Sequence, residues 1–213
     1  MTLFEKNIEY LNRTISGLKL SENQPVSEIR SICEQNNISF QNLVLFNLEA
    51  SALNWNKIRF VFLDVDGVMT EGGMFYTEDG DEFKRFDTKD GMAIKEAMKA
   101  GIEFGIISSG VNSKIIQHRA DMFGIKRVYV GAEPKLSVAQ RWLDEMDLEW
   151  TEIGYIGDDI NDLKMFEKVG IAACPSDASI PNKQSAHFVL ESLGGHGCVR
   201  EFMRYHPKLM DIL

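Results

Sequence analysis

The sequence has few cysteines and no paired arrangement of them. Only three occur among 213 residues, Cys33, Cys174 and Cys198, and no two form a CxxC motif. An odd, scattered set is not typical of a disulfide framework or of a structural zinc site. A chain of this length can instead bury a substantial apolar core. The sequence therefore predicts a reduced, globular protein.

Long apolar runs and an excess of positive charge are also absent. No run approaches the roughly 20 apolar residues that span a bilayer. The first residues, MTLFEKNIEYLNR, carry polar and acidic side chains where a signal peptide has an apolar core. Lys and Arg number 23 against 32 Asp and Glu, a formal net charge of −9, whereas nucleic-acid binding needs clustered cations. We expect a cytoplasmic protein with no membrane or nucleic-acid partner.

Glycine is nearly absent from residues 1–56, where only Gly17 occurs. Apolar residues recur there at roughly helical spacing, from Leu3 to Ile15 and from Ile29 to Cys33. We expect a small helical N-terminal extension over 1–56, with a packing or oligomer-forming role.

Residues 57–213 have a different pattern, in which short β-rich runs alternate with amphipathic segments. Helices are expected over 91–101, 112–124, 135–146 and 160–170, and strands over 58–65, 103–109, 127–131, 152–159 and 171–175. This alternation predicts an α/β fold with a doubly wound, Rossmann-like parallel sheet. A hairpin is expected over 72–86, because Asp79-Gly80 is a strong turn signal.

Two acids end the first strand, in the motif Asp64-Val65-Asp66-Gly67. Ligands bind at the carboxyl ends of strands in such sheets. An ionised carboxylate there can act as a nucleophile, and a second one, two residues on, can act as general acid and base. Taken alone, the motif is equally typical of a calcium loop or a helix cap.

Three further strand ends carry polar residues. Residues 156–162, IGDDIND, place Asp158, Asp159 and Asp162 after an apolar strand, where they suit Mg²⁺ coordination, and one of them is expected to be only a helix cap. Ser108, Ser109 and Gly110 follow the second strand, and Lys135 follows the third. Hydroxyl, N–H and ammonium groups can bind a phosphoryl group, although each alone is more typical of a turn or a surface charge.

The four features, in this order, resemble the haloacid dehalogenase-like phosphatases over residues 58–206. The resemblance implies that Asp64 forms an aspartyl-phosphate and that Asp66 is the general acid and base. It also implies phosphoryl binding by Ser108 and Lys135. Mg²⁺ would be held by Asp64, Asp158 and the backbone carbonyl of Asp66, and supported by Asp159 and Asp162.

Within that superfamily the chain resembles the 3-deoxy-D-manno-octulosonate 8-phosphate phosphatase family. The segments that carry the resemblance are the hairpin after DVDGVMTEG, FDTKDGMAIK and GGHGCVREF. The gaps between motifs hold no cap domain, and the resemblance implies a hairpin flap instead, in a homotetramer whose hairpins close neighbouring sites. The expected reaction is hydrolysis of a keto-deoxy sugar acid phosphate.

One segment departs from the family pattern. Members commonly have Thr-Gly followed by Arg or Glu after the second strand, whereas this chain has the uncharged run Ser108 to Val111. Arg85, Lys84 or Lys89 could bind the substrate carboxylate in place of a missing cation. The hairpin is at least as similar to phosphatases of nine-carbon sugar acid 9-phosphates, so that substrate stays open.

A different class of function also stays open. Related domains are fused to sugar-acid cytidylyltransferases, where the resemblance implies a non-catalytic oligomerisation module. The catalytic positions of this chain are all filled by competent residues, which favours an enzyme.

Overall fold

The computed structural model describes residues 1–213, which fold as two compact units, Met1–Leu53 and Asn54–Leu213. The division falls at residue 53 and not at the expected residue 56. Trp55 accounts for the difference, since its ring lies 4.8 Å from that of Phe202 and 5.7 Å from that of Tyr205 in the second unit. No helix of either unit has the length and apolarity needed to cross a bilayer.

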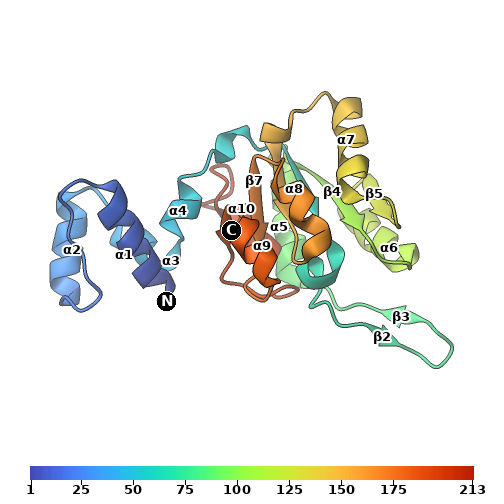
Figure 1. Ribbon diagram of the computed structural model, residues 1–213, viewed down its shortest axis with the longest axis horizontal. Helices are drawn as coiled ribbons and strands as arrows, with labels where there is room; N and C mark the ends of the chain where they lie inside the picture. Colours follow the sequence, from blue (N-terminus) through green and yellow to red (C-terminus); the bar gives the residue numbers. More distant parts are fainter. The chain divides into compact units, whose positions relative to one another are not determined.

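The first unit consists of four helices around a small core of its own (Figure 1). They are α1 (Leu3–Thr14), α2 (Val26–Gln35), α3 (Phe40–Leu45) and α4 (Leu48–Ser51). Their buried residues are Ile8, Leu11, Leu20, Ile29, Cys33 and Leu43. Asn7 is buried among them with its amide satisfied, because its Nδ2 donates to the carbonyls of Leu43 (2.9 Å) and Phe46 (2.6 Å).

The second unit is built on a six-stranded sheet in which every pair of neighbours is parallel. Its strands are β1 (Phe60–Leu63), β4 (Glu103–Ser108), β5 (Arg127–Val130), β6 (Ile153–Ile156), β7 (Ile171–Cys174) and β8 (Phe188–Val189). The order is β5-β4-β1-β6-β7-β8. The expected α/β parallel sheet is confirmed.

Helices cover both faces of the sheet, and alternating residues of β1 face them. The helices are α5 (Thr88–Lys99), α6 (Ser113–Phe123), α7 (Lys135–Met146), α8 (Leu163–Phe166), α9 (Ile180–Ser185) and α10 (Cys198–Arg204). Phe60 and Phe62 pack into one core cluster with residues of α7 and α8. Val61 lies on the opposite side, where Phe202 of α10 approaches the sheet.

The strand order reverses beside β1, which makes its carboxyl end the crevice of the sheet. From β1 the chain builds outward through β4 and β5, and then crosses back to add β6, β7 and β8 on the other side of β1. Ligands of doubly wound sheets bind at such a switch point. The fold thus brings the ends of β1, β4 and β6 together, with the start of α7 close by.

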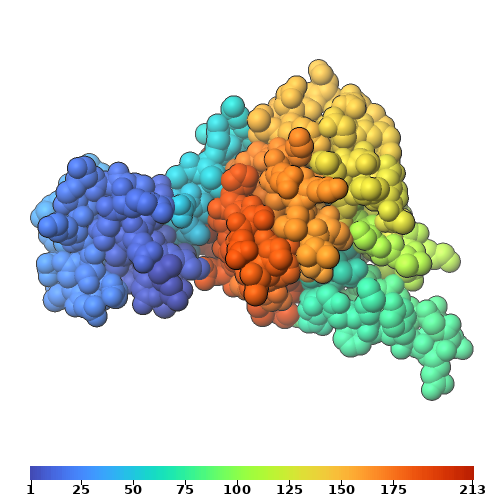
Figure 2. Space-filling view, in the orientation of Figure 1, coloured from blue at the N-terminus to red at the C-terminus, as the bar shows by residue number.

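The expected hairpin is formed by β2 (Phe75–Tyr76) and β3 (Glu82–Phe83), which pair antiparallel. Gly80 has φ +87°, so it supplies the left-handed residue of the turn. The hairpin extends away from the sheet and stands out from the surface of the second unit (Figures 1 and 2). No cap domain interrupts the chain, as the motif spacing predicted.

A glycine-rich segment near the C-terminus packs against the turn after β1. The backbone N–H of Gly195 donates to the carbonyl of Val68 (2.8 Å), and the thiol of Cys198 donates to the same carbonyl (3.1 Å). A Cβ atom on Gly194 would lie 2.0 Å from the carbonyl oxygen of Gly67. Only glycine at position 194 therefore permits this close approach, which explains the first glycine of the GGHG run.

This contact makes Gly194→Ala a test of the packing. We expect the substitution to destabilise the second unit by about 1–3 kcal/mol, because the added methyl group overlaps backbone that cannot move aside. The matched control is Gly73→Ala, since a Cβ there would meet nothing within 4 Å. Thermal unfolding followed by circular dichroism measures both, and equal midpoints for the two variants would contradict the assigned contact.

Candidate active site

Asp64 lies at the end of β1 with its carboxylate buried. Its backbone N–H donates to the carbonyl of Ile156 (3.1 Å), which continues the pairing of β1 with β6. Its Oδ1 accepts a hydrogen bond from the N–H of Val65 (2.7 Å), and its Oδ2 lies 2.8 Å from Nζ of Lys135. Burial raises the pKa of Asp64 to about 6, and Lys135 opposes that rise. The carboxylate is thus held by the backbone on one oxygen and by an ammonium group on the other.

Lys135 is the first residue of α7, and its side chain is only 2% exposed. Its Nζ lies between Oδ2 of Asp64 (2.8 Å) and Oδ1 of Asp162 (2.5 Å). Burial alone would lower the pKa of Lys135, but the two carboxylates outweigh burial and raise it. The side chain is therefore a charged ammonium that joins two loops, and not the solvated surface charge that an isolated lysine would suggest.

Asp162 is fully buried and accepts four hydrogen bonds. Its Oδ2 accepts from the N–H groups of Asp158 (2.9 Å) and Asp159 (3.2 Å), and its Oδ1 accepts from Lys135 and from the hydroxyl of Tyr155 (2.5 Å each). Because each oxygen already has two donors, Asp162 shapes the loop after β6. Its inward turn also shortens the helix expected over 160–170 to a 3₁₀ turn, Ile160–Asp162, followed by α8.

Carboxylate oxygens of Asp64, Asp158 and Asp162 all lie within 4.8 Å of one another. Burial, together with the charges of Asp64 and Asp162, raises the pKa of Asp158 to about 8. Two carboxyl groups with raised pKa values, beside a single ammonium group, favour binding of a divalent cation. Hard cations of this kind prefer oxygen ligands. With both oxygens of Asp162 occupied, Asp64 and Asp158 are the carboxylates free to bind it.

Two of the acids expected at the metal site, Asp66 and Asp159, have side chains that make other contacts. The side chain of Asp66 is outside the three-carboxylate cluster and contacts Lys84, so any part it has in holding the metal falls to its backbone carbonyl. Asp159 is exposed, and its Oδ1 accepts from the N–H of Ile160 (2.8 Å). Asp159 is thus the helix-capping acid that the sequence left unassigned among the three.

Gly67 explains the glycine of the first motif. Its φ is +83°, and a Cβ atom there would lie 2.0 Å from Oδ2 of Asp158. The loops after β1 and β6 can therefore approach each other only with glycine at this position.

The loop after β4 completes the site. Ser108 ends the strand and is buried, and its hydroxyl accepts a hydrogen bond from the N–H of Gly110 (3.1 Å). The hydroxyl of Ser109 accepts from Nδ2 of Asn161 (3.1 Å), which connects this loop to the one after β6. Asn161 was not among the residues expected at the site. The sequence carried a signal for it only in its position inside IGDDIND.

The other expected cations lie outside the pocket. Arg85 forms an exposed ion pair with Glu71 (2.9 Å), and Lys89 is exposed in the first turn of α5. The sequence analysis considered Lys84 as a ligand for a substrate carboxylate. Its side chain is buried instead, and its Nζ lies 2.6 Å from Oδ1 of Asp66.

A cavity of about 330 Å³ opens over these strand ends. It is lined by Asp64, Asp66, Gly72, Met74, Ser108, Ser109, Gly110, Asp158, Asp159, Ile160 and Asn161. The lining contains four acids, two hydroxyls and no lysine or arginine. Met74 and Ile160 supply an apolar rim, because both are more than half exposed. Such a pocket can hold a cation with a phosphate over Asp64.

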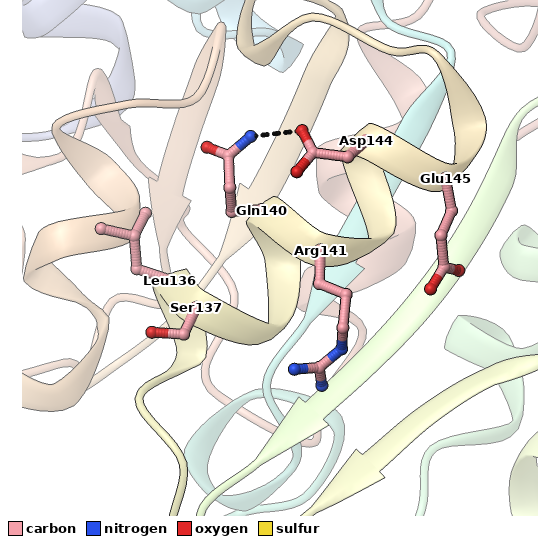
Figure 3. Close-up of a pocket in the computed structure, with 6 residues that line it drawn as sticks. All are labelled: Leu136, Ser137, Gln140, Arg141, Asp144 and Glu145. Carbon is pink, nitrogen blue, oxygen red and sulfur yellow. Dashed lines mark hydrogen bonds between the residues drawn. The ribbon is translucent and has the colours of Figure 1, made fainter.

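A larger hollow of about 780 Å³ lies on α7, away from the strand ends (Figure 3). Its polar side chains lie along the surface of one helix, where Gln140 donates to Asp144 (2.8 Å). None of the candidate residues lines it. The reactive groups therefore assign the site to the smaller cavity.

Comparison with known proteins agrees with this geometry. Residues 124–202 match the family model for haloacid dehalogenase-like hydrolases. The 3-deoxy-D-manno-octulosonate 8-phosphate phosphatase KdsC of Escherichia coli strain K12 is 35% identical over 145 residues, which cover 68% of this chain and 77% of that protein.

Two solved structures share the fold. The 3-deoxy-D-manno-octulosonate 8-phosphate phosphatase of Yersinia pestis is 31% identical with a TM-score of 0.70, over 76% of this chain and 84% of the other. The enzyme of that name from Moraxella catarrhalis, solved with a magnesium ion, a phosphate ion and a KDO molecule, is 26% identical with a TM-score of 0.69, over 76% and 89%.

The raised carboxyl pKa values predict how a cation affects stability. A carboxyl whose pKa is raised by folding holds a proton that the unfolded chain releases, so stability of the metal-free protein falls as pH rises from about 4 to 8. A bound cation removes this loss. We therefore expect Mg²⁺ to raise the melting temperature by about 5 °C or more at pH 8 and by much less at pH 5.5.

The variant Asp158→Asn tests whether this stabilisation by Mg²⁺ depends on Asp158. It lacks the carboxyl with the most raised pKa, so its metal-free form is expected to melt higher than wild type at pH 8 and to respond little to Mg²⁺. Differential scanning fluorimetry with and without EDTA measures both effects. A Mg²⁺ response of equal size at the two pH values, or one retained in Asp158→Asn, would contradict the assigned metal site.

Proposed function

The chain belongs to the KdsC-like phosphatases of the haloacid dehalogenase-like hydrolases and is a phosphoric monoester hydrolase, and we propose that its substrate is a keto-deoxy sugar acid phosphate of the 3-deoxy-D-manno-octulosonate 8-phosphate type. One observation carries the proposal: Asp64 is fixed by Lys135 at the sheet crevice, with Asp66 and Asp158 lining the same cavity. The KDO molecule and the phosphate in the relative from Moraxella catarrhalis support the substrate class.

The residues of the site suit a two-step transfer. In the first step a carboxylate oxygen of Asp64 attacks phosphorus, the ester P–O bond breaks, and Asp66 gives a proton to the leaving alkoxide. In the second step Asp66 takes a proton from water, whose oxygen attacks phosphorus and releases phosphate and free Asp64. Lys135 offsets negative charge at Asp64 in both steps. Mg²⁺, held by Asp64, Asp158 and the Asp66 carbonyl, would stabilise charge on the phosphoryl oxygens.

The loop after β4 is suited to bind the phosphoryl group. Ser108 and Gly110 lie at the carboxyl end of β4 and line the cavity beside the two catalytic acids. Ser109 is tied to Asn161, so the loop keeps a fixed position relative to the metal side of the pocket. Because the hydroxyls of Ser108 and Ser109 accept from Gly110 and Asn161, their own O–H groups can donate to phosphoryl oxygens.

The hairpin supports the homotetramer that the resemblance implied. Met74, Phe75, Tyr76 and Phe83 are each more than half exposed, which is unusual for neighbouring large apolar residues. We propose that they pack against another copy of the chain. The oligomeric state, like the cytoplasmic location, stays a prediction that analytical ultracentrifugation and cell fractionation can test.

A phosphatase screen tests the substrate. The full-length chain, with Mg²⁺, is assayed against 3-deoxy-D-manno-octulosonate 8-phosphate, a nine-carbon sugar acid 9-phosphate and common sugar phosphates. We expect the highest kcat/KM for the eight-carbon ester, and a higher value for the nine-carbon ester would select the alternative substrate. Absence of hydrolysis across the panel would favour the non-catalytic module. A truncated chain starting at Asn54 shows whether the first unit matters for activity.

Substitution of the two acids tests the mechanism. We expect Asp64→Asn to lose at least about a thousandfold in kcat, because an amide cannot attack phosphorus, and Asp66→Asn to lose about a hundredfold or more. EDTA should abolish wild-type activity. The control is Asp144→Asn on the outer side of α7, which should keep wild-type rates. Hydrolysis that survives Asp64→Asn would exclude the aspartyl-phosphate route.

A further inference from the structure

The side chain of Lys84 runs from the hairpin to the acid–base carboxylate. Lys84 follows β3, yet its side chain is only 2% exposed. Its Nζ lies 2.6 Å from Oδ1 of Asp66 and 2.7 Å from Oε1 of Glu82. Burial lowers the pKa of Lys84, but hydrogen bonds and charges from these two carboxylates outweigh it and raise that pKa. The hairpin therefore presents a charged ammonium to Asp66.

The two oxygens of Asp66 have different surroundings. Oδ1 accepts from Lys84 and, at 3.4 Å, from the hydroxyl of Thr70. Oδ2 faces the loop after β4, since a Cβ atom on Gly110 would lie 3.9 Å from it. Gly110 and Asp66 both line the cavity. Oδ1 is thus the anchored oxygen, and Oδ2 is the one directed at a bound phosphate ester.

Lys84 is poorly placed to bind a substrate carboxylate. Two of its three N–H donors face Asp66 and Glu82, and its side chain does not line the cavity over the strand ends. Withdrawing it toward the pocket would leave Glu82 and Asp66 without their cation, which is costly for buried charges. Its position favours an action on Asp66 itself.

We propose that Lys84 is a positioning residue for the reaction: by holding Oδ1 of Asp66 it keeps Oδ2 aimed at the leaving oxygen, so that proton transfer depends on the hairpin being in place. The inference rests on the proposed function, in which Asp66 is the general acid and base. In the first step the proton moves from Oδ2 to the leaving alkoxide as the P–O bond breaks. Lys84 keeps all its protons throughout.

Two substrates whose leaving groups differ in basicity can distinguish a positioning role of Lys84 from a purely structural one. An alkoxide from a sugar needs a proton as it leaves, whereas p-nitrophenolate is a weak base and leaves without one. The ratio kcat/KM covers steps up to the first irreversible one, so hydrolysis of the aspartyl-phosphate does not enter it. For Lys84→Met we expect kcat/KM to fall about thirtyfold with the sugar acid phosphate and less than threefold with p-nitrophenyl phosphate.

Further variants keep the test decisive. Lys84→Arg, which retains charge and reach, should recover most of the loss with the sugar acid phosphate. Lys84→Gln is the second variant if Lys84→Met does not fold, and should show the same selective loss. The matched control is Lys99→Met, which removes a solvent-exposed lysine paired with Glu96 and should leave both ratios unchanged. Retention of the Mg²⁺-induced rise in melting temperature shows that the metal site is intact.

The outcomes distinguish this inference from the proposed function. Equal losses with the two esters in the Lys84 variants, or no loss with either, would overturn the positioning role while the wild-type enzyme stays active. A selective loss with the sugar ester, restored by arginine, would support it. A wild-type chain that hydrolyses neither ester would refute the proposed function and this inference with it.

Discussion

The ammonium group of Lys135 is the contact on which the rest of the site depends. It lies 2.8 Å from Asp64 and 2.5 Å from Asp162, and all three side chains are buried. Removing one partner of a buried ion pair leaves an uncompensated charge, which is far more costly than losing a surface pair. The end of β1, the loop after β6 and the start of α7 must therefore meet at one nitrogen atom. A shift of α7 along its axis by one residue would separate them.

The charges around this contact also favour binding of a cation. The carboxylates of Asp64, Asp66, Glu82, Asp158 and Asp162 surround only two ammonium groups, those of Lys84 and Lys135. Even with Asp158 holding a proton, the negative charges outnumber the positive ones and would repel a phosphate dianion. The chain as a whole adds to the repulsion, since its net charge is −9. A divalent cation would reduce this excess of negative charge and would attract the phosphate directly.

The sequence allowed the sheet and the strand-end residues to be predicted because both are local signals. Alternating β-rich and amphipathic runs indicate parallel strands, and polar residues after such runs must lie at one edge. Contacts between distant segments could not be predicted in this way. Period-two alternation in β3 places Glu82 and Lys84 on the face opposite Phe83, but it does not say that this face meets Asp66. The short α9, with sequence IPNKQS, has no helical periodicity to detect.

The hairpin, which we propose stands in place of a cap domain, is a small element. Two strands of two residues each are not stable alone in water. The ion pair of Arg85 with Glu71 adds little, because it is exposed and solvent screens it. The buried contact of Lys84 with Asp66 is the stronger tie to the site, and it forms on the face opposite Phe75 and Phe83, which pair across the hairpin. The hairpin is thus held at the site by its contact with Asp66, the acid that we propose it positions. It also leaves its outer face free to pack against another copy of the chain.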